Sequence, residues 1–301
     1  MNKILILASL CFLSACQKNN FFDEKKIAVS GYVSNLSGIE IVVSKLLATE
    51  ASYSLSNSQN IFFINGAKVT IYENEKKIVD LIFKENGIYV FNDTLTWKPT
   101  IGLKYKVKVL TSEGDVVESE EVIFPKAALI SKISYKIDTL MEDESRIAAT
   151  INMEIEKKQV DNNFYQLSYN PQSSKYKKFI GIDRDFSLDE DLEKKFPECP
   201  YLYVLNSNIF SDKCMEGNKY TQRKFFAGSS PDIVNSVKID SFRLQLATIS
   251  QSYYQFWDNL YRQGIVDTRF QEMPPSYTNI RNGIGCFYAK NESPRVFVVK
   301  P

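Results

Sequence analysis

Alternation of apolar and polar residues between residues 26 and 124 is the feature that most limits the fold of this chain. In residues 104–109, Lys-Tyr-Lys-Val-Lys-Val, every second side chain is apolar or aromatic. Successive side chains of a β-strand point to opposite faces of the sheet, so this period of two predicts a strand with one buried face. Similar patterns predict further strands at 27–34, 39–44, 67–73, 78–83, 87–91 and 116–124.

Turn residues separate these predicted strands. Asn65-Gly66 and Asn86-Gly87 lie between them, and glycine readily adopts the positive φ that tight turns require. About seven short strands with turns between them are typical of an immunoglobulin-like β-sandwich. The sequence therefore predicts such a sandwich over residues 26–124.

A second β-rich region follows the first. Pro125 ends the first block, and residues 125–130 are the predicted joint. Strand patterns then resume, which predicts a β-rich C-terminal domain at 131–301 with a loop insertion near 170–235. The whole chain is therefore predicted to be mostly β, with two β-rich domains and one short amphipathic helix.

That helix is predicted to follow residue 249. Ser250 can cap its first turn, and Gly264 can end it. One face of the helix carries an aromatic and apolar stripe: Tyr253, Phe256, Trp257, Leu260 and Tyr261. Such a stripe is more often core packing than a ligand platform. Tyr254 lies off the stripe and is the candidate for an exposed contact.

The first residues of the chain predict a secretory signal. Lys3 provides a basic start, residues 4–12 are mostly apolar, and small residues precede Cys16 in the run Leu13-Ser14-Ala15-Cys16. This run resembles a bacterial lipoprotein signal. In such a signal the cysteine sulfur takes a diacylglycerol, the peptide is cleaved before the cysteine, and the new amine is acylated.

This interpretation predicts a signal peptide at 1–15, a lipid anchor on Cys16 and a polar tether over 16–25. Two alternatives remain. A transmembrane helix over 4–13 would be too short, because about 20 apolar residues are needed to cross a bilayer. Ordinary secretion would leave Cys16 as an unmodified thiol.

The composition narrows the classes of function. The chain contains no His, and it has 37 basic and 36 acidic residues. Without His it lacks the usual general base, the Ser-His-Asp and Cys-His pairings and the commonest zinc ligand. A nearly neutral chain also has no strong field to attract nucleic acid. We therefore expect no catalysis, no nucleic-acid partner and no cofactor beyond the lipid on Cys16.

Three cysteines remain once Cys11 is lost with the signal and Cys16 is acylated. Cys199 and Cys214 bracket a loop-like segment and form the candidate disulfide, because exported proteins enter an oxidising compartment. Closing a loop near that size would stabilise the fold by about 3 kcal/mol. Cys286 lies in a predicted strand and is expected to be a buried free thiol.

No metal site is predicted. Zinc needs four ligands, and three cysteines without His do not readily supply them. Residues 183–190 begin like a calcium-binding loop, with acidic or hydroxyl groups at alternate positions. However, Leu188 replaces the glycine of the sharp turn, and Lys194 replaces the bidentate Glu. An exposed acidic segment is the better interpretation.

Five short segments carry a resemblance to a known family: 29–35, 64–71, 102–107, 250–254 and 279–285. In this order and spacing they resemble the domain of unknown function 4249 family of Bacteroidota lipoproteins. The resemblance implies an outer-membrane lipoprotein that is often encoded beside a TonB-dependent receptor. It implies no catalytic residues. Cys286 departs from the pattern, which has a small or apolar residue there.

We therefore expect a non-catalytic lipoprotein that is anchored at the outer membrane. It would act as the accessory or ligand-capturing partner of a TonB-dependent transporter, and the sequence leaves its leaflet open. A surface adhesion or structural lipoprotein is the alternative. A carboxylate-dependent hydrolase is a third, because paired carboxylates that meet in space leave no mark in a sequence.

Overall fold

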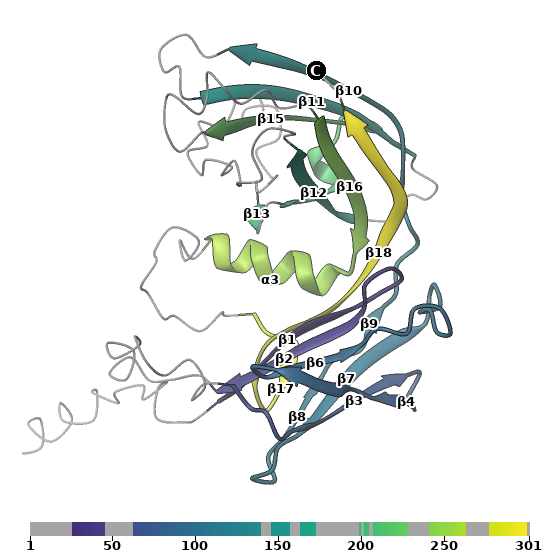
Figure 1. Ribbon diagram of the computed structural model, residues 1–301, viewed down its shortest axis with the longest axis vertical. Helices are drawn as coiled ribbons and strands as arrows, with labels where there is room; N and C mark the ends of the chain where they lie inside the picture. The colour runs from purple at the N-terminus through teal and green to yellow at the C-terminus, as the bar shows by residue number, and fades with distance from the viewer. Residues whose placement is uncertain are drawn as a thin grey trace, which may run out of the picture.

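The computed structural model describes residues 26–45, 63–139, 146–156, 163–172, 199, 202–204, 207–227, 241–262 and 277–299. The predicted signal peptide, Cys16, the tether and the acidic segment at 183–190 lie outside these residues. The described part is mostly β, with sheets of nine, six and three strands and one α-helix, α3 (Figure 1). The predicted fold class is confirmed.

The N-terminal part of the chain forms two facing sheets. In the first sheet, four strands are neighbours in this spatial order: β1 (Ile27–Ser34), β2 (Gly38–Lys45), β6 (Ile88–Phe91) and β5 (Ile82–Glu85). The other contains β3 (Lys68–Glu73), β4 (Lys76–Asp80), β7 (Lys104–Leu110), β8 (Val116–Ser119) and the short β9 (Val122–Ile123). The chain passes from the second sheet to the first at Leu81. This is the sandwich that the alternation predicts.

The alternating residues fill the space between these two sheets. In β7, Tyr105, Val107 and Val109 are buried, whereas Lys104, Lys106 and Lys108 lie on the other face. Val29 and Val33 of β1 and Ile39, Ile41 and Val43 of β2 oppose them in the same core. The period of two therefore indicates which segments form strands and which face of each strand is buried.

The C-terminal part continues the first sheet and adds a third. The three-stranded sheet contains β10 (Leu129–Thr139), β11 (Arg146–Glu156) and β15 (Lys219–Ala227). The nine-stranded sheet gains β12 (Phe164–Gln172), β13 (Leu202–Val204), β14 (Ser207–Ser211), β16 (Ser241–Ile249) and β18 (Ile284–Val299). The remaining elements are a 3₁₀ turn, η3 (Asp212–Cys214), the helix α3 (Gln251–Arg262) and the short strand β17 (Ile280–Arg281).

The predicted loop insertion near 170–235 is wrong for part of its length, because β13, β14, η3 and β15 lie within it. All five residues of β14 are buried, so the strand shows no alternation along its sequence. In β15, the segment Lys-Tyr-Thr-Gln-Arg-Lys hides the strand pattern behind polar side chains. β14 pairs with the distant β12 as well as with its neighbour β13, and β15 pairs with the distant β11. The long-range pairs leave no local sign in the sequence.

The last long strand, β18, belongs to both parts of the molecule. Its first half pairs in parallel with β1, from Ala28↔Ile284 to Ser34↔Lys290, and its second half pairs with β16. Pro294, which has no N–H, lies where the β16 register shifts. Figure 1 shows β18 running from the sandwich up to the sheets above it.

This pairing corrects the predicted division of the chain. Residues 131–301 were expected to form one C-terminal domain, but Ile280, Phe287 and Ala289 lie in the core of the N-terminal sandwich. β17 also pairs with β8. A strand from near the N-terminus and one from near the C-terminus therefore lie side by side in one sheet. Such a parallel pair requires a long crossover connection, which a local sequence pattern does not reveal.

Two glycines allow the close approach of the strands around β1. A Cβ on Gly31 would lie 2.2 Å from the carbonyl oxygen of Glu40 in β2. A Cβ on Gly285 would lie 2.1 Å from the carbonyl oxygen of Val29, and the φ of Gly285 is +115°. Real Cβ contacts are not this short. Glycine is therefore needed at both positions for β1 to pack between β2 and β18.

Asn279 completes the parallel junction. Its Nδ2 donates to the carbonyl of Phe287 at 2.7 Å, and the N–H of Phe287 donates to its Oδ1 at 2.9 Å. The buried amide thus satisfies one backbone unit of β18 as a neighbouring strand would. The family-like segments 29–35 and 279–285 therefore contain packing residues.

Candidate functional site

A cluster of tyrosines and charged groups lies on the face of the nine-stranded sheet that is turned away from the sandwich core. Tyr32 comes from β1, and Tyr288, Lys290 and Glu292 come from β18. Alternate residues of β18 share a face, and the register places Tyr32 opposite Tyr288. The helix α3 adds Tyr253. We call these five residues the tyrosine–lysine cluster.

Ring contacts hold the cluster together. The rings of Tyr253 and Tyr288 are stacked with centroids 3.8 Å apart, and the rings of Tyr32 and Tyr288 are 5.7 Å apart. Lys290 Nζ lies 4.0 Å from the centroid of the Tyr32 ring. An ammonium at this position is attracted to the negative face of the ring. The helix, β1 and β18 therefore meet through aromatic and cation–π contacts.

Glu292 is held by residues of the turn between β1 and β2 and by Lys290 of its own strand. Its carboxylate accepts hydrogen bonds from the hydroxyls of Ser34 and Ser37, the latter at 2.8 Å. Lys290 Nζ lies 3.6 Å from the same carboxylate, and the Lys290 and Glu292 side chains are only 15% and 13% exposed. The side chain of Asn35 also pairs with both backbone groups of Glu292. The turn is therefore fastened to β18.

Burial changes the protonation behaviour of this cluster. It lowers the pKa of Lys290, while Glu292 and Glu40 act in the opposite direction. Burial, followed by the charges of Glu40 and Glu292, raises the pKa of Tyr32 to about 12. Burial also raises the pKa of Tyr288 well above its usual value. The tyrosine hydroxyls are thus protonated at neutral pH.

The chemistry open to this cluster is binding through rings and hydrogen bonds. Protonated tyrosine hydroxyls donate and accept hydrogen bonds, and the half-buried Tyr32 presents part of its ring to solvent. The Glu292 carboxylate already has two hydroxyl donors and an ammonium, so it is not available as a general base. Sequence reasoning missed this cluster, because only the pairing of β1 with β18 brings its members together.

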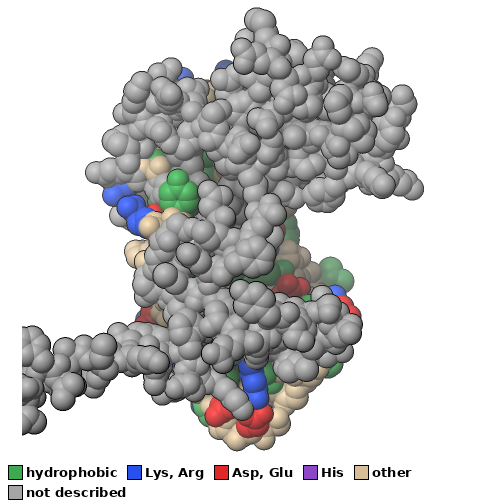
Figure 2. Space-filling view, turned by 90° about the vertical axis from the view of Figure 1, so that its left-hand side faces the viewer, with side chains coloured by type: hydrophobic (Ala, Val, Ile, Leu, Met, Phe, Trp, Pro, Cys, Tyr) green, Lys and Arg blue, Asp and Glu red, His purple; other side chains and the backbone are tan. Residues whose placement is uncertain are grey.

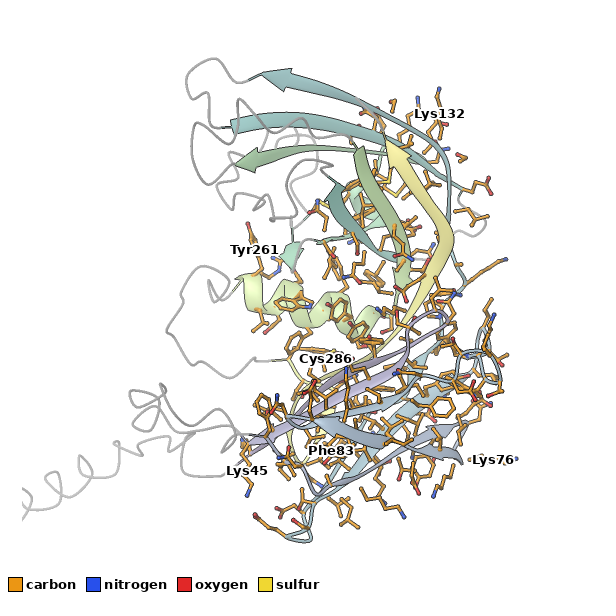
Figure 3. The ribbon with its side chains drawn as sticks, in the orientation of Figure 1. Lys45, Lys76, Phe83, Lys132, Tyr261 and Cys286 are labelled. Atoms are coloured by element: carbon orange, nitrogen blue, oxygen red, sulfur yellow. A yellow bond between two sulfur atoms is a disulfide. The ribbon has the colours of Figure 1, made fainter. Side chains whose placement is uncertain are left out.

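The predicted contact residue Tyr254 lies elsewhere, and it is only partly exposed. Tyr254 is half-buried, and its ring lies 4.6 Å from that of Phe164 in β12. The exposed aromatic residue of α3 is Tyr261, at 42%. Figure 3 shows Tyr261 at the end of α3 that lies far from β18.

Packing explains why Tyr261 is more exposed than Tyr254. The first turn of α3 is covered on two sides, by Tyr288 next to Tyr253 and by Phe164 next to Tyr254. Its last turn extends past the sheet, so Tyr261 loses the cover that the helical stripe predicts. The stripe describes the buried face correctly at Tyr253, and Phe256 and Trp257 pack beside the same cluster.

The three remaining cysteines lie as the sequence suggests. Cys199 and Cys214 form a disulfide, with a Cα–Cα distance of 5.2 Å and a sequence separation of 15. Cys286 is a buried free thiol between α3 and the sandwich (Figure 3), and burial raises its pKa. A buried thiol of raised pKa is chemically inert.

Two further features bear on ligands and membranes. Among the described residues, no group of three or more Cys, Asp or Glu side chains is arranged to hold a metal ion. None of the helices in the described ranges is long and apolar enough to cross a bilayer.

Comparisons with known proteins agree with the family-like segments. The family model named Domain of unknown function (DUF4249) matches residues 17–295. Comparison with curated proteins gives no match. Among solved structures, the chain is similar to a "putative carbohydrate binding protein" from Bacteroides uniformis, with 12% identity and a TM-score of 0.22. That alignment covers 91% of this chain and 98% of the other, and the TM-score is too low to indicate a shared function.

Proposed function

Because the chain belongs to the DUF4249 family, we propose that it is a non-catalytic outer-membrane lipoprotein and the accessory partner of a TonB-dependent transporter. In this proposal the acyl chains on Cys16 hold the protein at the membrane. The folded body then captures ligand for the transporter or contacts its rim. Restriction to the membrane raises the effective concentration of the body next to its partner.

The observation that carries the proposal is the place of β1 in the nine-stranded sheet. β1 starts at Ile27, soon after the proposed anchor, and it pairs along its length with β2 on one side and β18 on the other. A force on the anchor would therefore act on a central strand that is hydrogen-bonded to two neighbours. An edge strand, which has only one neighbour, would separate from its sheet more easily. This is the arrangement that a rigid body carried on a lipid needs.

The chemistry of the cluster supports a role in binding. The chain has no His, and the carboxylate of the tyrosine–lysine cluster, Glu292, serves to fasten a turn. Tyr32 at the cluster and Tyr261 at the end of α3 offer aromatic surface to a partner. Aromatic side chains are enriched at protein interfaces and line ligand sites.

The test is co-purification from native membranes. The chain with a C-terminal tag is extracted from the outer membrane in mild detergent, and the proteins recovered with it are identified. A β-barrel receptor in stoichiometric amount is the expected partner. Cys16→Ala should reduce its recovery, because the anchor no longer concentrates the protein at the membrane.

Cys11→Ala is the matched control, because it removes a cysteine from the signal and leaves Cys16 in place. It should keep the partner. Recovery of the lipoprotein alone from well-solubilised membranes would contradict the partnership and favour a surface adhesion role.

A further inference from the structure

We propose that one end of the sandwich rests on the lipid bilayer that holds the anchor. The surface consists of Lys68, Leu110, Val116 and Arg281 beside the turn at 111–115, and we call it the tether end. This inference rests on the proposed lipid anchor at Cys16. It adds an orientation: the turn between β7 and β8 faces the membrane, and the β3–β4 turn faces away from it.

The position of this surface follows from the strand registers. Ile27, the first residue of β1, lies opposite Lys45, the last residue of β2. Lys45 Nζ lies 2.6 Å from Glu113 Oε1, and Glu113 belongs to the turn that joins β7 to β8. The start of β1 and this turn therefore lie at the same end of the sandwich. Figure 3 shows Lys45 at this end and Lys76 at the opposite one.

The length of chain between the anchor and the fold limits the distance to the bilayer. Ten Cα–Cα steps lead from Cys16 to Lys26. Even when fully extended, they span at most about 35 Å. The end of the sandwich at which β1 begins is thus the end closest to the lipid along the chain, which argues for a lipid surface as its occupant.

The side chains of the tether end suit the interface of a bilayer. Lys68 lies opposite Leu110, and Leu110 lies opposite Val116, so the three form one row across β3, β7 and β8. Leu110 and Val116 are exposed at 41% and 40%. The Lys68 side chain is 60% exposed, and Arg281 of β17 is exposed near the other end of the row. Two apolar side chains between two basic ones match acyl chains beneath phosphate headgroups.

The acidic groups at this end include Glu118, which lies opposite Arg281 and 2.8 Å from Lys106, and Glu85 before the β5–β6 turn. Glu113 is neutralised by Lys45, and Asp80 lies 3.8 Å from Lys68 and 2.7 Å from Lys77. Asp115 is the remaining carboxylate of the turn. Figure 2 shows basic and acidic side chains together at the lower end of the molecule, with hydrophobic ones among them. The surface is therefore mixed in charge and carries one exposed apolar pair, Leu110 and Val116.

The test measures which end of the anchored protein lies near lipid. The acylated full chain is placed in vesicles of phosphatidylethanolamine and phosphatidylglycerol that contain a lipid with a nitroxide headgroup. A fluorophore is attached through Ser112→Cys in the β7–β8 turn or through Lys76→Cys at the opposite end. The native thiol Cys286 is buried and should not react. The seven residues of β7 separate the two ends by about 20 Å.

The expected result is loss of most of the Ser112 fluorescence and retention of the Lys76 fluorescence. Leu110→Glu combined with Val116→Glu should restore the Ser112 signal. Leu95→Glu should leave it quenched, because Leu95 is 96% exposed and follows β6 at the other end of the sandwich. Circular dichroism confirms that each variant is folded.

Two results would overturn the inference in distinguishable ways. Equal fluorescence of both probes in protein that floats with the vesicles leaves the anchor intact and refutes the orientation. Protein that stays in solution instead refutes the anchor, and the orientation falls with it.

Discussion

Gly285→Ala tests the parallel junction between β1 and β18. The new Cβ would meet the Val29 carbonyl oxygen at 2.1 Å and the Val29 carbonyl carbon at 2.9 Å. Both are backbone atoms of a strand that is paired on both sides, so the clash is relieved only by moving β1 and β18 apart. Overpacking of this kind costs about 1–3 kcal/mol. The φ of +115° adds about 1–3 kcal/mol for a residue with a side chain.

The assay is urea unfolding of the chain from residue 17, which lacks the anchor. The free energy of unfolding should fall by about 2–6 kcal/mol, the sum of the two costs. Gly114→Ala is the matched control, because Gly114 has a φ of +93° and its added Cβ meets nothing within 4 Å. Gly114→Ala should therefore show the backbone cost alone.

The difference between the two variants measures the contact with β1. Equal destabilisation by Gly285→Ala and Gly114→Ala would contradict the expected clash. It would mean that β18 lies farther from β1 than the 2.1 Å contact requires.

Three further predictions concern the same fold. Cys199→Ser with Cys214→Ser should cost about 3 kcal/mol in urea unfolding, because the bridge closes a loop with a separation of 15; a reductant should destabilise the wild type and leave the double variant unchanged. Asn279→Ala should cost about 1–3 kcal/mol in the same assay, because it leaves the buried N–H of Phe287 without a partner and removes the closer donor to its C=O, which keeps the hydroxyl of Ser252 at 3.3 Å. The pKa of Tyr32 is raised from 10.0 to about 12, so its contribution to stability is present below pH 10 and is lost as the pH rises toward 12. Urea midpoints measured over that range should fall for the wild type and fall less for Tyr32→Phe.

The sandwich could be predicted because its strands carry their own signal. In β1, β2 and β7 one face is mostly buried and the other is more exposed, so burial appears directly as alternation. The disulfide partners and the buried Cys286 could also be identified, since the number and spacing of cysteines leave few arrangements. These features depend on residues that are near in sequence or few in number.

The closure of the chain could not be predicted, because it depends on contacts between distant segments. Nothing local in residues 284–290 indicates that they lie beside residues 28–34. The tyrosine–lysine cluster exists only because of that pairing, so it was missed with it. The relative exposure of Tyr254 and Tyr261 could not be predicted for a related reason. Helical periodicity gives the direction of a side chain, but it does not show where the covering sheet ends.

The intact mass of the mature protein, isolated from the outer membrane, decides whether Cys16 carries the lipid anchor. The expected chain begins at Cys16 and carries the mass of a diacylglycerol and an amide-linked acyl chain. Fragmentation should place both on Cys16. A chain that keeps residues 1–15, or that begins at an unmodified Cys16, would contradict the lipid anchor and with it the proposed function.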